Sequence, residues 1–172
     1  MSLQTESDQD DIDDTATVTT RPAKATSQYA LTTKERALGL LARREHSAAE
    51  LKRKLLQKGC ATDEIVSGLS ELQAEGALSD KRFTEAYVHM RKNKGYGPLR
   101  IMAELREKGI GADLADEYLH QDVQDWQSVL RQQYQKKFAG NPLTDYHDKS
   151  KRIGYLQARG FKLEWIFDLF DE

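Results

Sequence analysis

The sequence predicts an all-α fold made of three tandem three-helix repeats. Apolar residues recur at helical spacing along most of the chain, and alternating β-branched runs bounded by turn pairs, the usual signature of strands, are missing. Three similar segments end in glycines that are 50 and 51 residues apart, namely Gly59, Gly109 and Gly160. Periods of this size indicate stacked supersecondary units.

The three segments share a register as well as a final glycine. A leucine lies four residues before each glycine and a basic residue lies one before it: Leu55, Leu105 and Leu156, and Lys58, Lys108 and Arg159. Basic residues there interact favourably with the negative end of a helix dipole, and glycine suits the left-handed residue that follows a helix. Each segment is therefore predicted to be a helix, the second of its repeat, that ends at its glycine.

Two helix starts in the first repeat are marked by capping boxes. Thr32 and Ser47 are each followed three residues later by a glutamate, Glu35 and Glu50. In a capping box the hydroxyl accepts from the third backbone N–H of the helix, while the glutamate side chain returns to the cap residue. A third helix after Thr62 is expected to bury the apolar residues Ile65, Leu69 and Leu72.

The second repeat opens with a helix that Ser79 and Asp80 can cap, and its predicted buried face holds Phe83, Tyr87 and Met90. Pro98 begins the next helix, and a third carries Leu114, Tyr118 and Leu119. In the third repeat we expect a helix over residues 123–138, a loop or helix extension over 138–150, and a last helix with four apolar residues, Trp165, Ile166, Leu169 and Phe170.

Composition divides the chain into a leader, residues 1–28, and repeats over 29–77, 78–122 and 123–172. The leader holds six acidic and two basic residues with almost no large apolar side chain, so we expect it to be a disordered, solubilising segment. The alternative is that the acidic leader mimics nucleic acid and competes for the basic surface. A repeat of about 45 residues is marginal alone. We therefore expect neighbouring repeats to share core in an elongated, gently curved array of about nine helices.

Charge is patterned although the net charge is only −2. The first two helices of each repeat are rich in lysine and arginine, whereas the third helices and their linkers are acidic. Such a pattern predicts one positive and one negative side, and long-range potentials of this kind orient an acidic partner. The residues that we predict to contact a partner or DNA are Arg43, Arg44, Arg53, Arg91, Lys92, Lys94, Arg100, Arg106, Lys151, Arg152 and Arg159.

The threefold recurrence favours binding over the usual interpretation of charged helix faces as solvated surface. Three tyrosines lie among these cations and could stack on bases, although each taken singly is more typical of packing: Tyr96, Tyr134 and Tyr155.

The sequence indicates no enzyme, cofactor or metal site. The four histidines are far apart, the glycines before Pro98 lack the Gly-Lys-Ser/Thr of a phosphate loop, and no nucleophilic triad has supporting context. Cys60 is the only cysteine, which excludes an intrachain disulfide. The absence of a secretory signal or membrane-length apolar run predicts a cytoplasmic protein, and repeat stacking predicts a monomer.

The central repeat resembles the RecX family, regulators of the RecA recombinase. The residues that carry the resemblance are Leu78, Asp80, Phe83, Tyr87 and Arg91, followed by Gly97, Leu105 and Lys108-Gly109-Ile110. The resemblance extends from about Thr33 to the C-terminus, and Thr84 departs from the small apolar residue that is more frequent in the family.

This resemblance implies a regulator, mainly an inhibitor, that binds the RecA filament on single-stranded DNA and suppresses its ATPase, strand exchange and growth. The implied setting is the control of recombination, DNA repair and the SOS response. Two alternatives remain from the residues themselves: a helical module that binds single- or double-stranded DNA directly, without recombinase specificity, and a structural adaptor with no DNA-related partner.

Overall fold

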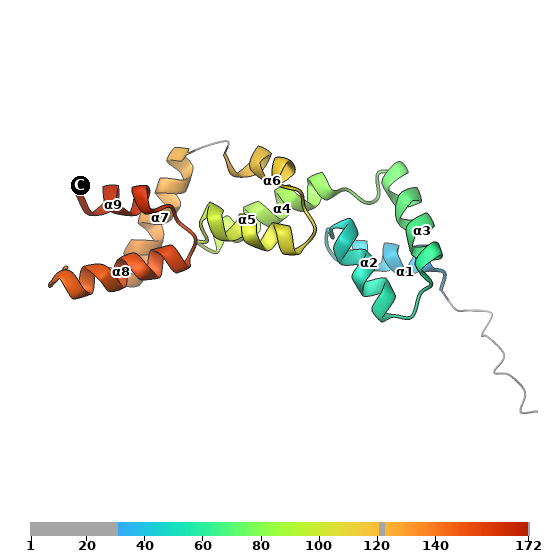
Figure 1. The fold of residues 1–172 in the computed structure, drawn as a ribbon, viewed down its shortest axis with the longest axis horizontal. Helices are drawn as coiled ribbons and strands as arrows, with labels where there is room; N and C mark the ends of the chain where they lie inside the picture. The colour runs from blue at the N-terminus through green and yellow to red at the C-terminus, as the bar shows by residue number, and fades with distance from the viewer. Residues whose placement is uncertain (1–30, 121–122, 172) are drawn as a thin grey trace, which may run out of the picture. The chain divides into compact units, whose positions relative to one another are not determined.

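The computed structural model describes residues 31–120 and 123–171, and this part of the chain contains nine α-helices and no strand (Figure 1). The all-α prediction is confirmed, whereas the predicted leader, residues 1–28, lies outside the described residues. The helices are α1 (Thr33–Leu41), α2 (Ala48–Gln57), α3 (Thr62–Ala74), α4 (Asp80–Asn93), α5 (Pro98–Glu107), α6 (Ala112–Leu119), α7 (Val123–Phe138), α8 (Tyr146–Ala158) and α9 (Leu163–Asp171).

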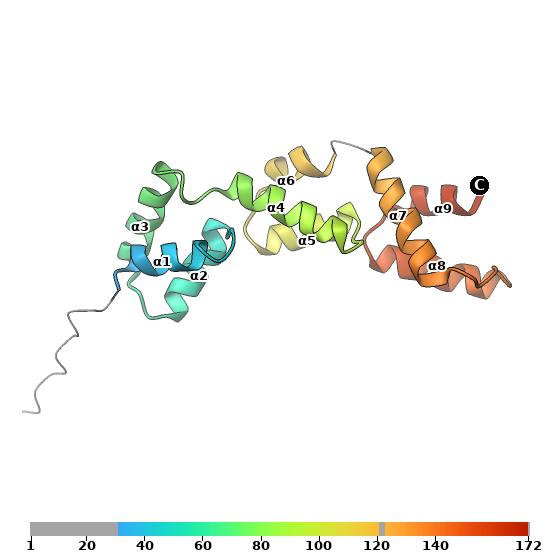
Figure 2. The ribbon, with the colours of Figure 1, turned by 180° about the vertical axis from the view of Figure 1, so that it is seen from behind.

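The helices pack in three consecutive groups. Helix α1 contacts α2 and α3, α4 contacts α5 and α6, and α9 contacts both α7 and α8. The same groups can be followed from behind in Figure 2. Helix α7 ends at Phe138, as predicted, and residues 139–145 are not helical, so the loop alternative is correct for this segment, whereas residues 146–150 belong to α8.

The second helix of every group ends in the same Schellman motif. The residue after each glycine donates its backbone N–H to the carbonyl of the leucine that lies four residues before that glycine. Cys60 donates to Leu55 at 3.1 Å, Ile110 to Leu105 at 3.0 Å and Phe161 to Leu156 at 3.3 Å. The three glycines have φ of +77°, +78° and +89°, and the three leucines are fully buried. The repeat register deduced from the sequence is therefore confirmed.

One predicted capping box is complete and the other is half formed. Thr32 and Glu35 make both reciprocal hydrogen bonds. Ser47 accepts from the N–H of Glu50 at 3.1 Å, but the Glu50 carboxylate turns away to Arg44, whose Nη2 is 2.6 Å from Oε1. The predicted return bond from Glu50 is wrong, because a guanidinium is a stronger partner for a buried carboxylate than one backbone N–H.

The buried face of α4 differs from the predicted one. Phe83 is buried, but Met90 is 38% exposed, and the other buried residues are Thr84 and Val88. The Thr84 hydroxyl is satisfied because it donates to the carbonyl of Asp80 at 2.7 Å. The contacts of α4 with α5 and α6 decide which of its sides is covered, and the last turn leaves Met90 outside.

The described residues form two apolar cores, not one continuous core. The first is formed by the first repeat together with Leu78, which precedes α4: Ala37, Leu51, Leu55, Ile65, Leu69, Leu72 and Leu78. The second runs through α4 to α9, from Phe83 to Ile166. The prediction of shared core is therefore confirmed for the second and third repeats and wrong for the first and second.

Polar contacts join the first repeat to the second. The Ser47 hydroxyl donates to the carbonyl of Lys108 at 2.7 Å, and the Ala48 N–H donates to Asp80 at 2.8 Å. An ion pair joins Arg82 and Glu45 at 2.8 Å. These contacts replace the apolar packing expected at this joint.

Candidate functional site

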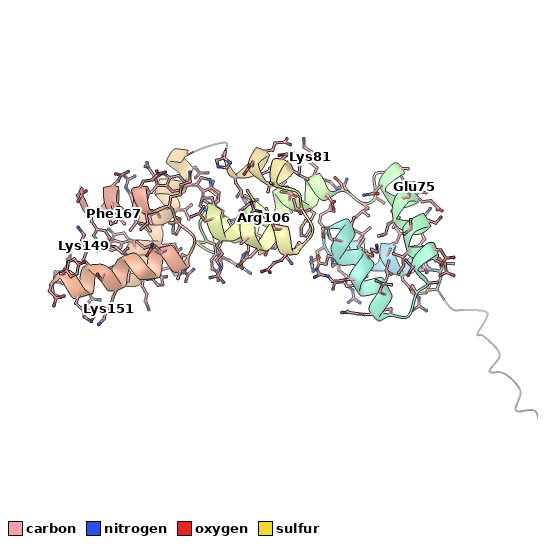
Figure 3. The ribbon with its side chains drawn as sticks, viewed as in Figure 1. Glu75, Lys81, Arg106, Lys149, Lys151 and Phe167 are labelled. Atoms are coloured by element: carbon pink, nitrogen blue, oxygen red, sulfur yellow. The ribbon has the colours of Figure 1, made fainter. Side chains whose placement is uncertain are left out.

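Acidic residues of the third helices neutralise lysines of the first helices in the first two repeats. Lys34 on α1 lies 2.9 Å from Glu71 on α3 and 2.7 Å from Glu75, the residue that follows α3, and its hydrogen bond lowers the pKa of Glu71. Lys81 on α4 lies 2.9 Å from Glu117 on α6. Figure 3 labels Glu75 and Lys81. The predicted positive and negative sides thus meet and partly cancel along α1 and α4.

The second helices keep exposed cations that form no ion pair with any described residue. These are Lys52 and Arg53 on α2, Arg106 on α5 and Lys151 on α8. Figure 3 shows Lys151 extending from α8 on the side opposite Lys149, whose ammonium lies 5.2 Å from the centre of the Phe170 ring on α9. Each repeat therefore presents on its second helix an exposed positive charge that forms no ion pair with a described residue.

Three predicted contact residues meet at the joint between the second and third repeats. The guanidinium carbons of Arg91, Arg100 and Arg159 lie 3.8, 4.6 and 5.0 Å from the centre of the Tyr96 ring. Arg100 also donates to the carbonyl of Ala158 at 3.1 Å. The structure thus brings these arginines together around one aromatic ring and ties them to both repeats.

One carboxylate, that of Glu104, balances part of this positive charge. It accepts from Arg91, from Arg100 at 3.1 Å and from the Tyr87 hydroxyl at 3.0 Å. Burial opposes ionisation of Glu104, but these hydrogen bonds outweigh it and lower its pKa. Burial and the Glu104 contact raise the pKa of Tyr87 to about 12. The cluster is consequently preorganised and keeps a net positive charge at neutral pH.

Arg152 has a different position from the other predicted cations because it is only 3% exposed. Its guanidinium lies 2.6 Å from Asp148 and donates to the Tyr134 hydroxyl at 2.8 Å. It also donates to the carbonyls of Asn141 and Pro142 at 3.1 and 3.0 Å. This placement argues against a partner contact, because all of these groups would lose their donor if Arg152 turned outward.

The repeat register explains the burial of Arg152. It lies eight residues before Gly160, and the residues eight before the other two glycines are Leu51 and Ile101, both fully buried. Arg152 thus occupies a core position of the repeat. The alignment on the glycines carries this signal, but a count of basic residues does not detect it.

The remaining predicted cations are distributed over different surroundings. Arg43 and Lys94 are exposed, whereas Lys92 pairs with Asp125 and lies 4.6 Å from the centre of the Trp126 ring. Arg44 is held by Glu50 beside the buried His46. Sequence reasoning missed this Arg44–His46–Glu50 group, whose members are close in sequence but belong to no standard motif.

The three tyrosines considered for base stacking are engaged within the protein. Tyr96 is surrounded by the three arginines of the joint. Tyr134 packs against Phe170 at 5.5 Å between ring centres, and Tyr155 packs against Phe138 at 5.5 Å. These contacts favour a packing role for each tyrosine.

The described residues contain no group of three or more histidine, cysteine, aspartate or glutamate side chains placed to hold a metal ion. Among the same residues, no helix combines the length and apolar character needed to cross a membrane.

The family comparison covers most of the described chain. Residues 34–72 match the first three-helix domain of RecX, residues 79–119 match the second, and residues 124–170 match the third.

Curated relatives and solved structures agree with this match. The chain is 42% identical over 136 residues to a regulatory protein RecX of Legionella pneumophila (strain Corby), covering 79% of this chain and 91% of the relative. It is 40% identical over 130 residues to one of Pseudomonas entomophila (strain L48), covering 76% and 84%. Two RecX crystal structures share the fold, each at 21% sequence identity. A structure of regulatory protein RecX has a TM-score of 0.70 and covers 81% of this chain and 70% of that chain. A structure of RecX from Lactobacillus salivarius has a TM-score of 0.68 and covers 81% of this chain and 92% of that chain. The chain belongs to the RecX family of regulatory proteins.

Proposed function

We propose that this protein regulates the RecA recombinase, mainly as an inhibitor, by binding the RecA filament on single-stranded DNA. Binding suppresses ATP hydrolysis, strand exchange and filament growth, in the control of recombination, DNA repair and the SOS response. The protein acts in the cytoplasm as a monomeric binding protein, without a cofactor and without enzymatic activity. Its membership in a family of regulatory proteins and its three-repeat fold support this proposal.

The observation that carries the proposal is the exposed positive charge on the second helices that is not held in ion pairs with described residues. Arg53, Arg106 and Lys151 are exposed, one in each repeat, and none forms an ion pair with a described residue. A filament repeats the same acidic groups at regular intervals, so successive repeats of this chain can contact successive sites. Several weak contacts on one chain act multivalently, because the later contacts form at a high effective concentration.

The central test is ATP hydrolysis by a cognate RecA filament on single-stranded DNA, with this protein titrated from well below to above the recombinase concentration at low and high salt. Inhibition at substoichiometric levels would support filament regulation. Inhibition only in excess over DNA sites, relieved by added DNA, would instead favour the direct DNA-binding module. No inhibition at either salt concentration would refute the proposal.

Charge reversal on the second helices tests the surface itself. The variant Arg53→Glu, Arg106→Glu, Lys151→Glu is expected to raise the concentration for half-inhibition by about tenfold or more, equivalent to about 1.4 kcal/mol. The control reverses one exposed or half-exposed cation on the first helix of each repeat, Arg36→Glu, Lys81→Glu and Lys136→Glu. Equal weakening by both triple variants would indicate a general charge effect and contradict the chosen surface.

A further inference from the structure

The two joints between neighbouring repeats are built differently. At the second joint, between the second and third repeats, Phe161 is 1% exposed and belongs to the same apolar core as Phe83. The backbone N–H of Gly97, before α5, also donates to the carbonyl of Arg159, after α8, at 2.8 Å. A shared core and a backbone hydrogen bond hold these two repeats in one arrangement, because closely packed interiors resist deformation.

The first joint, between the first and second repeats, is held by polar side chains. Arg82 on α4 lies 2.8 Å from Glu45 and donates to the carbonyl of Ala77 at 3.1 Å. The hydrogen bonds of Ser47 and Ala48 described above cross the same joint. The Glu45–Arg82 pair is partly exposed, and ion pairs of this kind stabilise a structure little and are screened by salt.

Apolar packing at the first joint is sparse. A cavity of about 240 Å³ lies between Arg44 and Glu45 on one side and apolar side chains of α4, including Met90, on the other. Ala49 lies against Gly109, where an added Cβ would be 2.5 Å away, but a methyl group and a glycine bury little apolar area. An interface with little buried apolar surface permits its two sides to move relative to each other.

One residue, Ser79, connects the two sides of the first joint along the chain, and this connection can be followed between α3 and α4 in Figures 1 and 2. Leu78 before it belongs to the first apolar core and donates its N–H to the carbonyl of Leu72 at 2.9 Å. Asp80 after it begins α4. Ser79 is extended, with φ of −147° and ψ of 114°, in a broad region where both torsion angles can change without steric penalty. Hinges are commonly formed by such residues at the ends of elements.

We propose that the first joint is a hinge at Ser79, held closed by the Glu45–Arg82 ion pair, about which residues 31–78 rotate as one body against residues 80–120 and 123–171. The exposed cations Arg106 and Lys151 then keep a fixed separation, whereas Arg53 on α2 moves relative to both. The protein thus presents two charged helices in a fixed arrangement and an adjustable third.

This arrangement extends the proposed function but does not depend on it. In filament binding, rotation at the hinge lets α2 reach acidic groups whose spacing from those facing α5 and α8 varies. Motion at the hinge itself is a property of the free protein and is measured without a recombinase.

Electron–electron double resonance between spin labels tests the hinge in the full-length protein. Labels are attached to Gln57→Cys, Glu107→Cys and Ala158→Cys, three exposed sites at the same repeat position, in a Cys60→Ser background. In about 1 M salt, which screens the ion pair, the 57–107 distance distribution should be about twice as wide as the 107–158 distribution. Lowering the salt to about 0.1 M should narrow the first distribution and leave the second unchanged. Equal widths in high salt would overturn the hinge.

Two carboxylate-to-amide substitutions separate the role of the ion pair from a general effect of charge. Glu45→Gln removes the pair with Arg82 across the joint, and Glu117→Gln removes the pair with Lys81 at 2.9 Å inside the second repeat. In about 0.1 M salt, Glu45→Gln should widen the 57–107 distribution to its high-salt width, and Glu117→Gln should leave it at the wild-type width. Wild-type widths in both variants, or equal widening in both, would overturn the proposal while leaving the proposed function untouched.

Discussion

The hydroxyl of Ser47 donates a hydrogen bond to the carbonyl oxygen of Lys108 at 2.7 Å, so the residue that begins α2 also holds the end of α5. The Ser47 hydroxyl oxygen also accepts from the N–H of Glu50 at 3.1 Å. One side chain therefore links the start of a helix to the joint between two repeats. Because the two repeats share no apolar core, this polar link contributes to their relative arrangement.

Replacing Ser47 by alanine should remove both interactions. Ser79 is the matched control, because it caps α4 through the N–H of Arg82 at 3.2 Å and makes no hydrogen bond to a described residue of another repeat. We expect Ser47→Ala to lower the free energy of unfolding by about 1 kcal/mol more than Ser79→Ala, which is the net value of one buried hydrogen bond. Urea unfolding measures both values, and equal losses would show that the inter-repeat bond contributes nothing.

Alanine at Gly109 should cost more than alanine at Gly59. Both positions have nearly the same positive φ, so each substitution carries a backbone cost of about 1–2 kcal/mol. Only the new methyl at position 109 collides with Ala49, which adds about 1–3 kcal/mol of overpacking. Denaturant unfolding of the two variants gives the difference directly. A Gly59→Ala variant as unstable as Gly109→Ala would contradict the open surroundings of Gly59.

Arg152→Ala should destabilise the third repeat, whereas Lys151→Ala should not. Removal of Arg152 leaves Asp148, the Tyr134 hydroxyl and two loop carbonyls without their donor. We expect the melting temperature of Arg152→Ala, followed by circular dichroism, to fall by about 5 °C or more. Lys151 is exposed and forms no ion pair with a described residue, so Lys151→Ala should have the melting temperature of the wild-type protein. A wild-type melting temperature for Arg152→Ala would mean that the buried network is dispensable.

Stability should decrease in acid because of Glu50 and His46. Burial opposes ionisation of Glu50, but hydrogen bonds and charge from Arg44, together with His46, lower its pKa from 4.5 to about 2. Burial, followed by the charge of Arg44, lowers the pKa of His46 below 6.5, with a smaller contribution from Lys54 and opposition from Glu50. In both cases the unfolded chain binds a proton that the folded chain does not.

The sign is therefore the same for both groups. The His46 contribution is complete above about pH 6.5 and the Glu50 contribution above about pH 4.5, and each is lost as the pH falls through its folded pKa. Glu50 alone accounts for about 3 kcal/mol between about pH 4.5 and pH 2. Glu50→Gln should flatten the dependence of unfolding free energy on pH in that range, while Glu85→Gln, an exposed control on α4, should preserve it. An unchanged slope in Glu50→Gln would contradict this assignment.

The two apolar cores should respond separately to substitution. Leu55 and Leu105 hold the same repeat position and are fully buried, so each alanine variant should lose about 2–5 kcal/mol. Leu105→Ala should speed amide hydrogen exchange in α5, α8 and α9, because these helices share one core. Leu55→Ala should instead speed amide hydrogen exchange in α2 and α3. Faster exchange of α8 in Leu55→Ala would show that the cores are coupled.

The surroundings of the cations proposed to contact a partner could be predicted only in part from the sequence. The excess of basic residues on the second helices was visible, and Arg53, Arg106 and Lys151 are exposed as expected. The distinction between these residues and the buried Arg152 required the contacts of the third repeat. Charge counts treat every basic residue alike, whereas exposure depends on the helices that pack around it.

The sequence by itself determined the helix ends and the repeat register. The Thr32 capping box and the three glycine-ended helices depend on residues within a few positions of one another, so local chemistry decides them. Tertiary structure alone decided that Met90 stays outside, that Glu50 turns to Arg44, and that the first repeat keeps its own core. Helical periodicity specifies which residues share a face, but the helices that cover that face come from distant parts of the chain, and their packing determines which groups are buried, paired or left open.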